Sequence, residues 1–210
     1  MKGFFYGSAT AIITPFDENG VNFDTFAELI EHQITGGTDA IVFLGTTGEP
    51  ATMSLEEEFQ VMDYVVKKVA GRCKVIIGCG SNDTNHAIEM AKKAESYGAD
   101  GLLAVTPYYN KCTQNGLVAY YKAICDAVSI PVIAYNVPGR TGVEIQPATM
   151  AKIAEIAEAT GNSLNKTAIM LIETILPYMT IETIMEPRKR VSMQLPDRDA
   201  GREKACSTTD

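Results

Sequence analysis

Short apolar segments, rich in β-branched residues, recur about every 30 residues through the first two thirds of the chain, and this repeat most limits the possible folds. The segments are apolar on both faces, which is typical of strands in a covered parallel sheet. Each interval leaves room for one helix, so the repeat predicts consecutive βα units. The predicted strands are Ser8–Ile13, Ala40–Leu44, Lys74–Ile77, Gly101–Val105 and Pro131–Tyr135.

Amphipathic segments with helix-start signals lie between these strands. The clearest signal is the pair Ser54 and Glu57, which forms a capping box before an apolar stripe. Five such units predict an α/β fold of the (β/α)8 TIM-barrel type, with a doubly wound open sheet as the alternative. The other predicted helices are Thr25–Thr35 after Asp24, one from Asp83 or Thr84 through Tyr97, one from Thr113 through Val128, and one from Gln146 and Pro147 to Ile156.

Composition and charge exclude several classes of protein. The net charge of −8 argues against a nucleic-acid or anionic-membrane partner. No apolar stretch approaches the roughly 18–20 residues that a membrane span needs, and the first residues lack a signal peptide's apolar region. The five cysteines are odd in number and show no CxxC spacing, as expected of reduced thiols. We therefore expect a cytoplasmic protein that acts on small molecules.

Polar and aromatic residues follow the carboxyl ends of the predicted strands, where α/β folds place their chemistry. Thr46 and Thr47, flanked by glycines, expose hydroxyl and backbone N–H groups that can cradle a carboxylate. Tyr109 and Tyr135 can move protons, and Arg140 can hold a carboxylate in a fork of two hydrogen bonds. The motifs that follow the second to fifth strands are GTTGE (45–49), GCGSN (78–82), TPYYN (106–110) and YNVPGRTG (135–142).

These four motifs, in this order and spacing over about residues 3–156, resemble the dihydrodipicolinate synthase family. The family consists of class I aldolase-like lyases and includes N-acetylneuraminate lyase. The resemblance implies the 4-hydroxy-tetrahydrodipicolinate synthase reaction, in which pyruvate condenses with aspartate 4-semialdehyde through a lysine imine, in lysine and diaminopimelate biosynthesis. It implies no metal or organic cofactor, because the imine is the electron sink. It also implies a homo-oligomer, a dimer or a tetramer.

The resemblance implies a role for each matching residue. Tyr135 matches the proton donor beside the imine, and Thr46 matches the threonine of the proton relay. Tyr109 matches the relay tyrosine, which reaches a neighbouring subunit's site across a tight dimer. Thr47 matches the residue that holds the pyruvate carboxylate, and Arg140 matches the receptor for the carboxylate of aspartate semialdehyde.

The imine lysine of the family has no match in this chain. The family places it on the sixth strand, in a segment of the type I-x-x-I-K-E-A-[ST]-G-N. Here residues 153–162 read IAEIAEATGN, so the lysine position falls on Ala157, which cannot form an imine. Neither Lys152 nor Lys166 matches the nucleophile, and the apolar strand expected before the motif is missing.

The remaining residues are too few for three further βα units, which would need about 90 residues. We expect residues 1–156 to form βα units of a TIM-type barrel and residues 157–186 a degenerate remainder with one helix, Thr167–Ile175. Residues 187–210 have the composition of a disordered tail. Two other functions stay open: another pyruvate-dependent lyase, for N-acetylneuraminate or 2-keto-3-deoxy-sugar acids, or a non-catalytic truncated relative.

Overall fold

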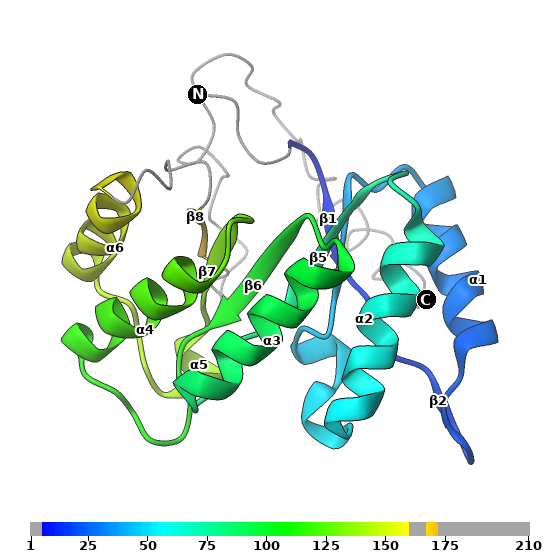
Figure 1. Cartoon of the computed structure of the whole chain (residues 1–210), viewed down its shortest axis with the longest axis horizontal. Helices are drawn as coiled ribbons and strands as arrows, with labels where there is room; N and C mark the ends of the chain where they lie inside the picture. Colours follow the sequence, from blue (N-terminus) through cyan, green and yellow to red (C-terminus); the bar gives the residue numbers. More distant parts are fainter. Residues whose placement is uncertain (1–5, 160–166, 172–210) are drawn as a thin grey trace, which may run out of the picture. The chain divides into compact units, whose positions relative to one another are not determined.

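The computed structural model describes residues 6–159 and 167–171, which form a parallel sheet beside a small hairpin (Figure 1). The six strands of the sheet are ordered β1-β4-β5-β6-β7-β8, so neighbours in the sheet are also neighbours along the chain, apart from the inserted hairpin. The hairpin pairs β2 (Phe16–Asp17) with β3 (Gly20–Val21). The bounds are β1 Ala9–Ala11, β4 Ala40–Phe43, β5 Lys74–Gly78, β6 Gly101–Val105, β7 Val132–Asn136 and β8 Thr167–Leu171.

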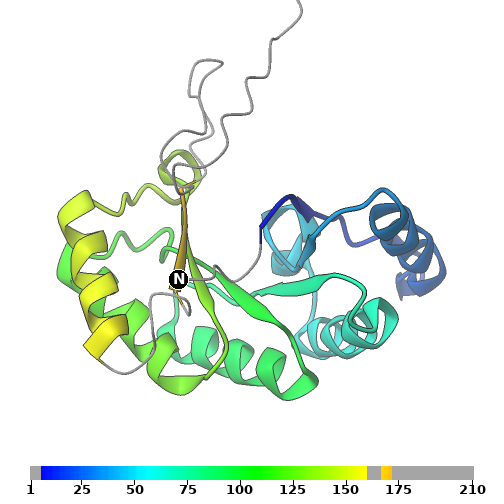
Figure 2. The same ribbon diagram turned by 90° about the horizontal axis from the view of Figure 1, so that it is seen from above.

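The five longer helices follow one another around one face of the curved sheet (Figure 2). A doubly wound fold would have helices on both faces and a reversal in strand order. The sequential strand order and one-sided helices therefore favour the barrel-type arrangement over that alternative. These helices are α1 Phe23–Thr35, α2 Leu55–Val69, α3 Thr84–Tyr97, α4 Gln114–Ala127 and α6 Pro147–Ala159.

The predicted caps are confirmed for three helices and wrong for one. In the capping box of α2, the Glu57 backbone N–H donates to Ser54 Oγ (3.3 Å) and the Ser54 backbone N–H donates to Glu57 Oε2 (2.8 Å). Helices α3 and α4 have the expected caps, Asp83 and Thr113. Helix α1 instead begins after Asn22, whose Oδ1 accepts a hydrogen bond from a first-turn N–H.

The predicted helix Thr167–Ile175 is wrong over the residues that the structure describes. Residues Thr167–Leu171 form strand β8, which pairs in parallel with β7. A short apolar run fits either a helix or a strand, and the free edge of β7 supplies the hydrogen-bonding partners that favour a strand here. The sheet thus has a sixth parallel strand, but it follows the EATGN motif (158–162), and the residues directly before that motif belong to helix α6. The predicted tail, residues 187–210, lies outside the described residues.

Two apolar clusters cover the two faces of the sheet. The larger cluster lies between the sheet and the helices and includes Phe26, Phe43 and Tyr121, all fully buried. The smaller cluster lies on the other face, and Tyr135 of β7 packs against it. Because side chains alternate between the faces of a strand, Ile133 and Tyr135 share a face. The smaller cluster consists of Ala40, Val42, Ile76, Leu103 and Ile133.

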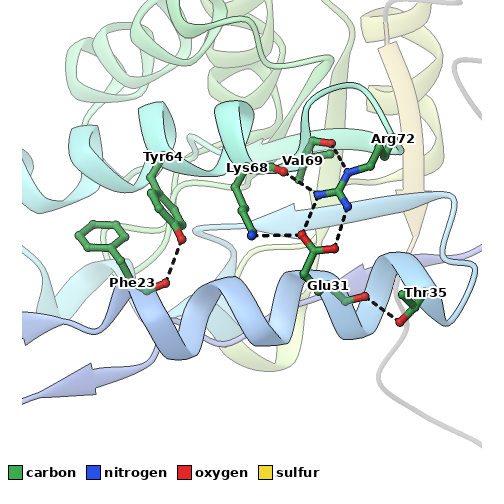
Figure 3. Close-up of polar contacts among 7 residues, drawn as sticks. All are labelled: Phe23, Glu31, Thr35, Tyr64, Lys68, Val69 and Arg72. Carbon is green, nitrogen blue, oxygen red and sulfur yellow. Dashed lines mark hydrogen bonds and ion pairs between the residues drawn. The ribbon is translucent and has the colours of Figure 1, made fainter.

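An ion network connects the first two helices (Figure 3). Arg72, just beyond the end of α2, donates to both carboxylate oxygens of Glu31 on α1, at 2.7 and 2.8 Å. The Lys68 ammonium lies 3.2 Å from the same carboxylate. The Tyr64 hydroxyl donates to the Phe23 carbonyl at 2.9 Å, which adds a second connection between α1 and α2.

No helix in the described part of the chain is long and apolar enough to cross a membrane.

Candidate active site

The predicted site residues lie in loops at the carboxyl ends of neighbouring strands. Thr46 and Thr47 stand in a short 3-10 turn, η1 (Thr46–Gly48), directly after β4, and both are exposed. The turn closes when the Gly48 N–H donates to the Gly45 carbonyl at 2.9 Å. Both residues are therefore accessible from solvent, and the carboxylate cradle expected of this turn stays a prediction.

Tyr135 stands near the end of β7 and is half-buried. Its backbone carbonyl accepts a hydrogen bond of 3.2 Å from the N–H of Thr106, the first residue after β6. The register pairs Tyr135 with Val105 of β6 on one side and with Met170 of β8 on the other. The phenol thus stands on the inner face of the sheet, at the carboxyl end of its strand.

Tyr109 lies in the loop after β6 and has an exposed fraction of 88%. Its φ of 70° is in the left-handed region, which is uncommon for a residue with a side chain. Tyr108 is much less exposed, at 38%. The structure therefore directs the second tyrosine of the pair outward, away from the packed residues of its own chain.

Arg140 belongs to the single-turn helix α5 (Pro138–Thr141) after β7, and it is exposed. Gly142 ends this turn with φ 68°, and its N–H donates to the Pro138 carbonyl at 2.9 Å. The Thr141 hydroxyl donates to the Val143 carbonyl at 2.9 Å, which fixes the chain that leaves the turn. The guanidinium has no hydrogen-bond or ion-pair partner among residues 6–159 and 167–171, so its donors are available to a ligand.

Two tyrosines of α4 hold the end of β6 in place. The Tyr120 hydroxyl donates to the Val105 carbonyl (3.2 Å) and accepts from the backbone N–H of Ser81 (3.0 Å), thereby joining two rim loops. The Tyr121 hydroxyl donates to the Ala104 carbonyl at 3.1 Å. Burial raises the pKa of both phenols well above the usual value, so they remain neutral hydrogen-bonding groups.

The cysteines near the rim do not supply a nucleophile. Cys79 follows β5 and is buried, and burial raises the pKa of its thiol to about 12. Burial also raises the pKa of the Cys112 thiol, in the loop before α4. Reactive cysteines need a lowered thiol pKa, because the thiolate is the attacking species.

The register shows which residue lies beside Tyr135 on the sixth strand. Ala157, the residue that the motif comparison aligned with the imine lysine, is part of helix α6 rather than of a strand. The backbone position that pairs with Tyr135 belongs to Met170. Neither residue is a lysine: Ala157 stands at the motif position, and Met170 stands at the strand position next to Tyr135.

The family of the chain is settled by comparison with known proteins. A model of the dihydrodipicolinate synthetase family matches residues 4–176. The chain belongs to this family. Its fold is accordingly part of the TIM barrel that the strand order and one-sided helices indicate.

Two relatives that the chain matches are named 4-hydroxy-tetrahydrodipicolinate synthase. The protein from Acetivibrio thermocellus is 56% identical over 155 residues, which are 74% of this chain and 53% of the relative. The protein from Geobacter metallireducens is 51% identical over 174 residues, or 80% of this chain and 60% of the relative. This chain thus spans only about half the length of the relatives it matches.

Solved structures give the same result. The crystal structure of dihydrodipicolinate synthase from Aquifex aeolicus has a TM-score of 0.72 and 45% identity, and the match covers 79% of this chain and 54% of that one. The chloride-inhibited enzyme from Acinetobacter baumannii, complexed with pyruvate, has a TM-score of 0.70 and 41% identity, with coverage of 78% and 62%.

Lys111 lies near these loops although no motif of the sequence includes it. Lys111, one residue after the TPYYN motif, has a left-handed backbone (φ 48°), and its side chain lies beside Gly142 of the arginine loop. The sequence carried one usable signal, a lysine in a short loop between two candidate site motifs.

Proposed function

We propose that this chain carries the substrate-binding and proton-transfer rim of a 4-hydroxy-tetrahydrodipicolinate synthase-type lyase. The enzyme condenses pyruvate with aspartate 4-semialdehyde through a lysine imine, in lysine and diaminopimelate biosynthesis. The observation that supports this best is the placement of Thr46, Thr47, Tyr135 and Arg140 after β4 and at the end of β7, in the order that the family motifs require. The pyruvate complex of the Acinetobacter baumannii relative supports pyruvate as the first substrate.

Each residue has a definite part in this proposal. The Thr47 hydroxyl and the N–H groups of its turn hold the pyruvate carboxylate. Tyr135, Thr46 and Tyr109 pass a proton to and from the reacting carbon and the oxygen that leaves as water. Arg140 holds the carboxylate of the aldehyde in a fork, because its guanidinium presents two parallel donors. No metal or organic cofactor takes part, since the imine itself withdraws the electrons.

Tyr109 supports a homo-oligomer as the working form. Its side chain is 88% exposed and so has little packing within its own chain. A relay tyrosine in this state can act only where a second copy covers it and brings it into a site. One related structure is described as the first monomeric dihydrodipicolinate synthase variant. Because a monomer is singled out in this way, we infer that other members of the family are usually oligomers.

A second candidate function is a non-catalytic relative that binds substrates but forms no imine. It is favoured by Ala157 in helix α6 and by Met170 beside Tyr135, where the reaction requires a lysine. This candidate predicts that the chain does not support growth of a lysine and diaminopimelate auxotroph on minimal medium. Growth of the transformed auxotroph would exclude it.

Borohydride trapping tests the proposal directly. The chain and its Met170→Lys variant are incubated with pyruvate, reduced and analysed by peptide mass spectrometry. Because Met170 is the register partner of Tyr135, the variant supplies a lysine at the strand position next to Tyr135 and should be labelled. Labelling of a wild-type lysine would show that this chain forms the imine unaided. If neither protein is labelled, the rim does not bind pyruvate as proposed.

The identity of the aldehyde acceptor is tested separately, with whichever protein, wild type or Met170→Lys, forms the reduced pyruvate adduct. Aspartate 4-semialdehyde is compared with the aldehyde acceptors of the N-acetylneuraminate and 2-keto-3-deoxy-sugar acid lyases. Faster consumption of a sugar aldehyde would replace the proposed acceptor with that of another pyruvate lyase.

A further inference from the structure

Two cations that form no ion pair with any described residue, Lys111 and Arg140, come from neighbouring loops of this acidic chain. Most cations of the described residues already have a partner: Lys67, Lys68, Arg72, Lys74 and Lys122 form ion pairs, and Lys93 lies over two aromatic rings. Lys92 and Lys152 lie on the outer helices α3 and α6. Lys111 and Arg140 are the cations of the described residues that lie in loops at the carboxyl ends of the strands.

The two cations come from loops that touch. The Lys111 Cε lies 3.5 Å from the position that a Cβ atom on Gly142 would take. Gly142 ends the single turn of α5 that contains Arg140. The aliphatic stem of the lysine therefore lies beside the end of the arginine turn, and the residue as a whole is exposed.

Hydrogen bonds fix the two loops to each other. Gln114, in the first turn of α4, donates through Nε2 to the Glu144 carbonyl at 2.8 Å. Its Oε1 accepts from the Gln146 backbone N–H at 3.1 Å and from the Thr149 hydroxyl at 2.6 Å. The chain just after the lysine loop is thus joined to the segment that follows the arginine turn, which holds the backbones of the two loops side by side.

We propose that Lys111 is a second cation of the acceptor site and acts with Arg140 on the carboxylate of an aldehyde acid. This inference rests on the proposed function and adds to it a specificity residue for the charged acceptor. An ammonium is a point charge without the fork of a guanidinium, so Lys111 attracts the anion while Arg140 orients it. In this way the pair favours acceptors with a carboxylate over neutral aldehydes.

The backbone of Lys111 guides the choice of variants. Because its φ of 48° suits asparagine better than most residues, Lys111→Asn removes the charge and keeps the loop conformation. Lys111→Arg keeps the charge. Lys92→Gln removes an exposed helix charge away from the rim and is the matched control for net charge.

The test is a titration of the ¹⁵N-labelled full chain with 4-oxobutanoate at low ionic strength, followed at the amide of Gly142. Lys111→Asn should raise the Kd about two- to fivefold, as expected for one exposed charge. Lys111→Arg should bind within about twofold of wild type, and Lys92→Gln should bind as wild type does. The difference between wild type and Lys111→Asn should disappear at about 0.5 M salt, because exposed charges are screened. Butyramide, which is uncharged, should bind equally to all of these proteins.

The outcomes separate this inference from the function on which it rests. If Arg140→Gln weakens binding and Lys111→Asn does not, the lysine has no part in the acceptor site and the proposed function stands. If Lys92→Gln weakens binding as much as Lys111→Asn, or if butyramide binding also falls, a local charge contact is refuted. If wild type does not bind 4-oxobutanoate, both the inference and the acceptor assignment fail.

Discussion

At the scale of single residues, the rim depends on glycines that let backbones approach closely. A Cβ on Gly78 would lie 2.0 Å from the Leu44 carbonyl oxygen, and a Cβ on Gly80 would lie 2.2 Å from the Val105 nitrogen. Backbone atoms at these distances cannot move aside as a flexible side chain does. The two glycines of the GCGSN motif are thus explained by the close approach of the Leu44 and Val105 backbones.

Gly78→Ala should therefore destabilise the protein by about 3 kcal/mol or more, because a backbone shift is the only relief for the clash. Gly139→Ala is the matched control, since no atom lies within 4 Å of its added methyl group. The control should change the free energy of unfolding by about 0.5 kcal/mol or less. Urea denaturation followed by circular dichroism measures both. Equal stability of the two variants would contradict the close approach at Gly78.

The buried carboxyl of Glu58 should make the stability of the protein depend on pH. Its side chain is buried on α2, and burial raises the pKa of its carboxyl to about 7. The carboxyl is protonated more readily in the folded state, so its contribution favours folding below pH 4.5 and is lost as the pH rises through 7.

Glu58→Gln should accordingly be more stable than wild type at pH 8, by on the order of 1–3 kcal/mol, and about equal to it at pH 4. Thermal unfolding at a series of pH values measures this difference. Glu56→Gln, an exposed substitution in the same turn, should not reproduce the effect. A stability difference that does not change with pH would show that Glu58 is not held in a desolvated position.

At the scale of helices and strands, the strands of the regular 30-residue repeat were predictable, whereas the apolar run outside that repeat, Thr167–Leu171, was not. The strand Gly101–Val105 was predicted to the residue, because turn residues bound a strongly apolar run. Strand β8 was mistaken for a helix, since five apolar or β-branched residues carry neither period and the pairing with β7 decides the outcome.

The candidate site shows the same limit. Motifs at strand ends placed Thr46, Tyr135 and Arg140 on one rim from the sequence alone. The contact between Lys111 and the arginine turn depends on a left-handed backbone and on the Gln114 bridge, neither of which motif spacing encodes.

The ion network between α1 and α2 gives a prediction at this scale. The Arg72 guanidinium, and then the Lys68 ammonium, lower the pKa of the Glu31 carboxyl to about 2. A lowered pKa means that Glu31 stabilises the fold above about pH 4.5 and that this contribution is lost as the pH falls toward 2. Glu31→Gln should therefore lower the midpoint temperature at pH 7 and lose less stability than wild type on acidification.

The matched control is Glu28→Gln, an exposed carboxyl on the same helix. Because the network is exposed, high salt should reduce the effect of Glu31→Gln. Thermal unfolding at pH 7 and pH 3, with and without 1 M salt, provides the measurement. A Glu31→Gln variant as stable as wild type at pH 7 would show that the contacts in Figure 3 do not hold α1 to α2.

At the scale of the whole described part of the chain, the protection of backbone amides against hydrogen exchange should depend on where their strand lies in the sheet. Strands β5 and β6 lie at its centre, with parallel neighbours on both sides and helices over one face. Strand β1 is three residues long and pairs on one side with β4, and β8 ends the sheet at the other edge. Central strands open only when much of the sheet opens, whereas edge strands can open alone.

Hydrogen exchange followed by mass spectrometry should thus find the slowest amides in β5 and β6, with β1 and β8 exchanging faster by about tenfold or more. If a second copy of the chain covers an edge strand, exchange there should slow as the protein concentration rises, while the centre is unchanged. If the amides of all strands from β1 to β8 exchange equally slowly at low protein concentration, β1 and β8 are not the unpaired edges that the described residues indicate. Concentration-dependent protection at Tyr109 would in turn support the oligomer on which the proton relay depends.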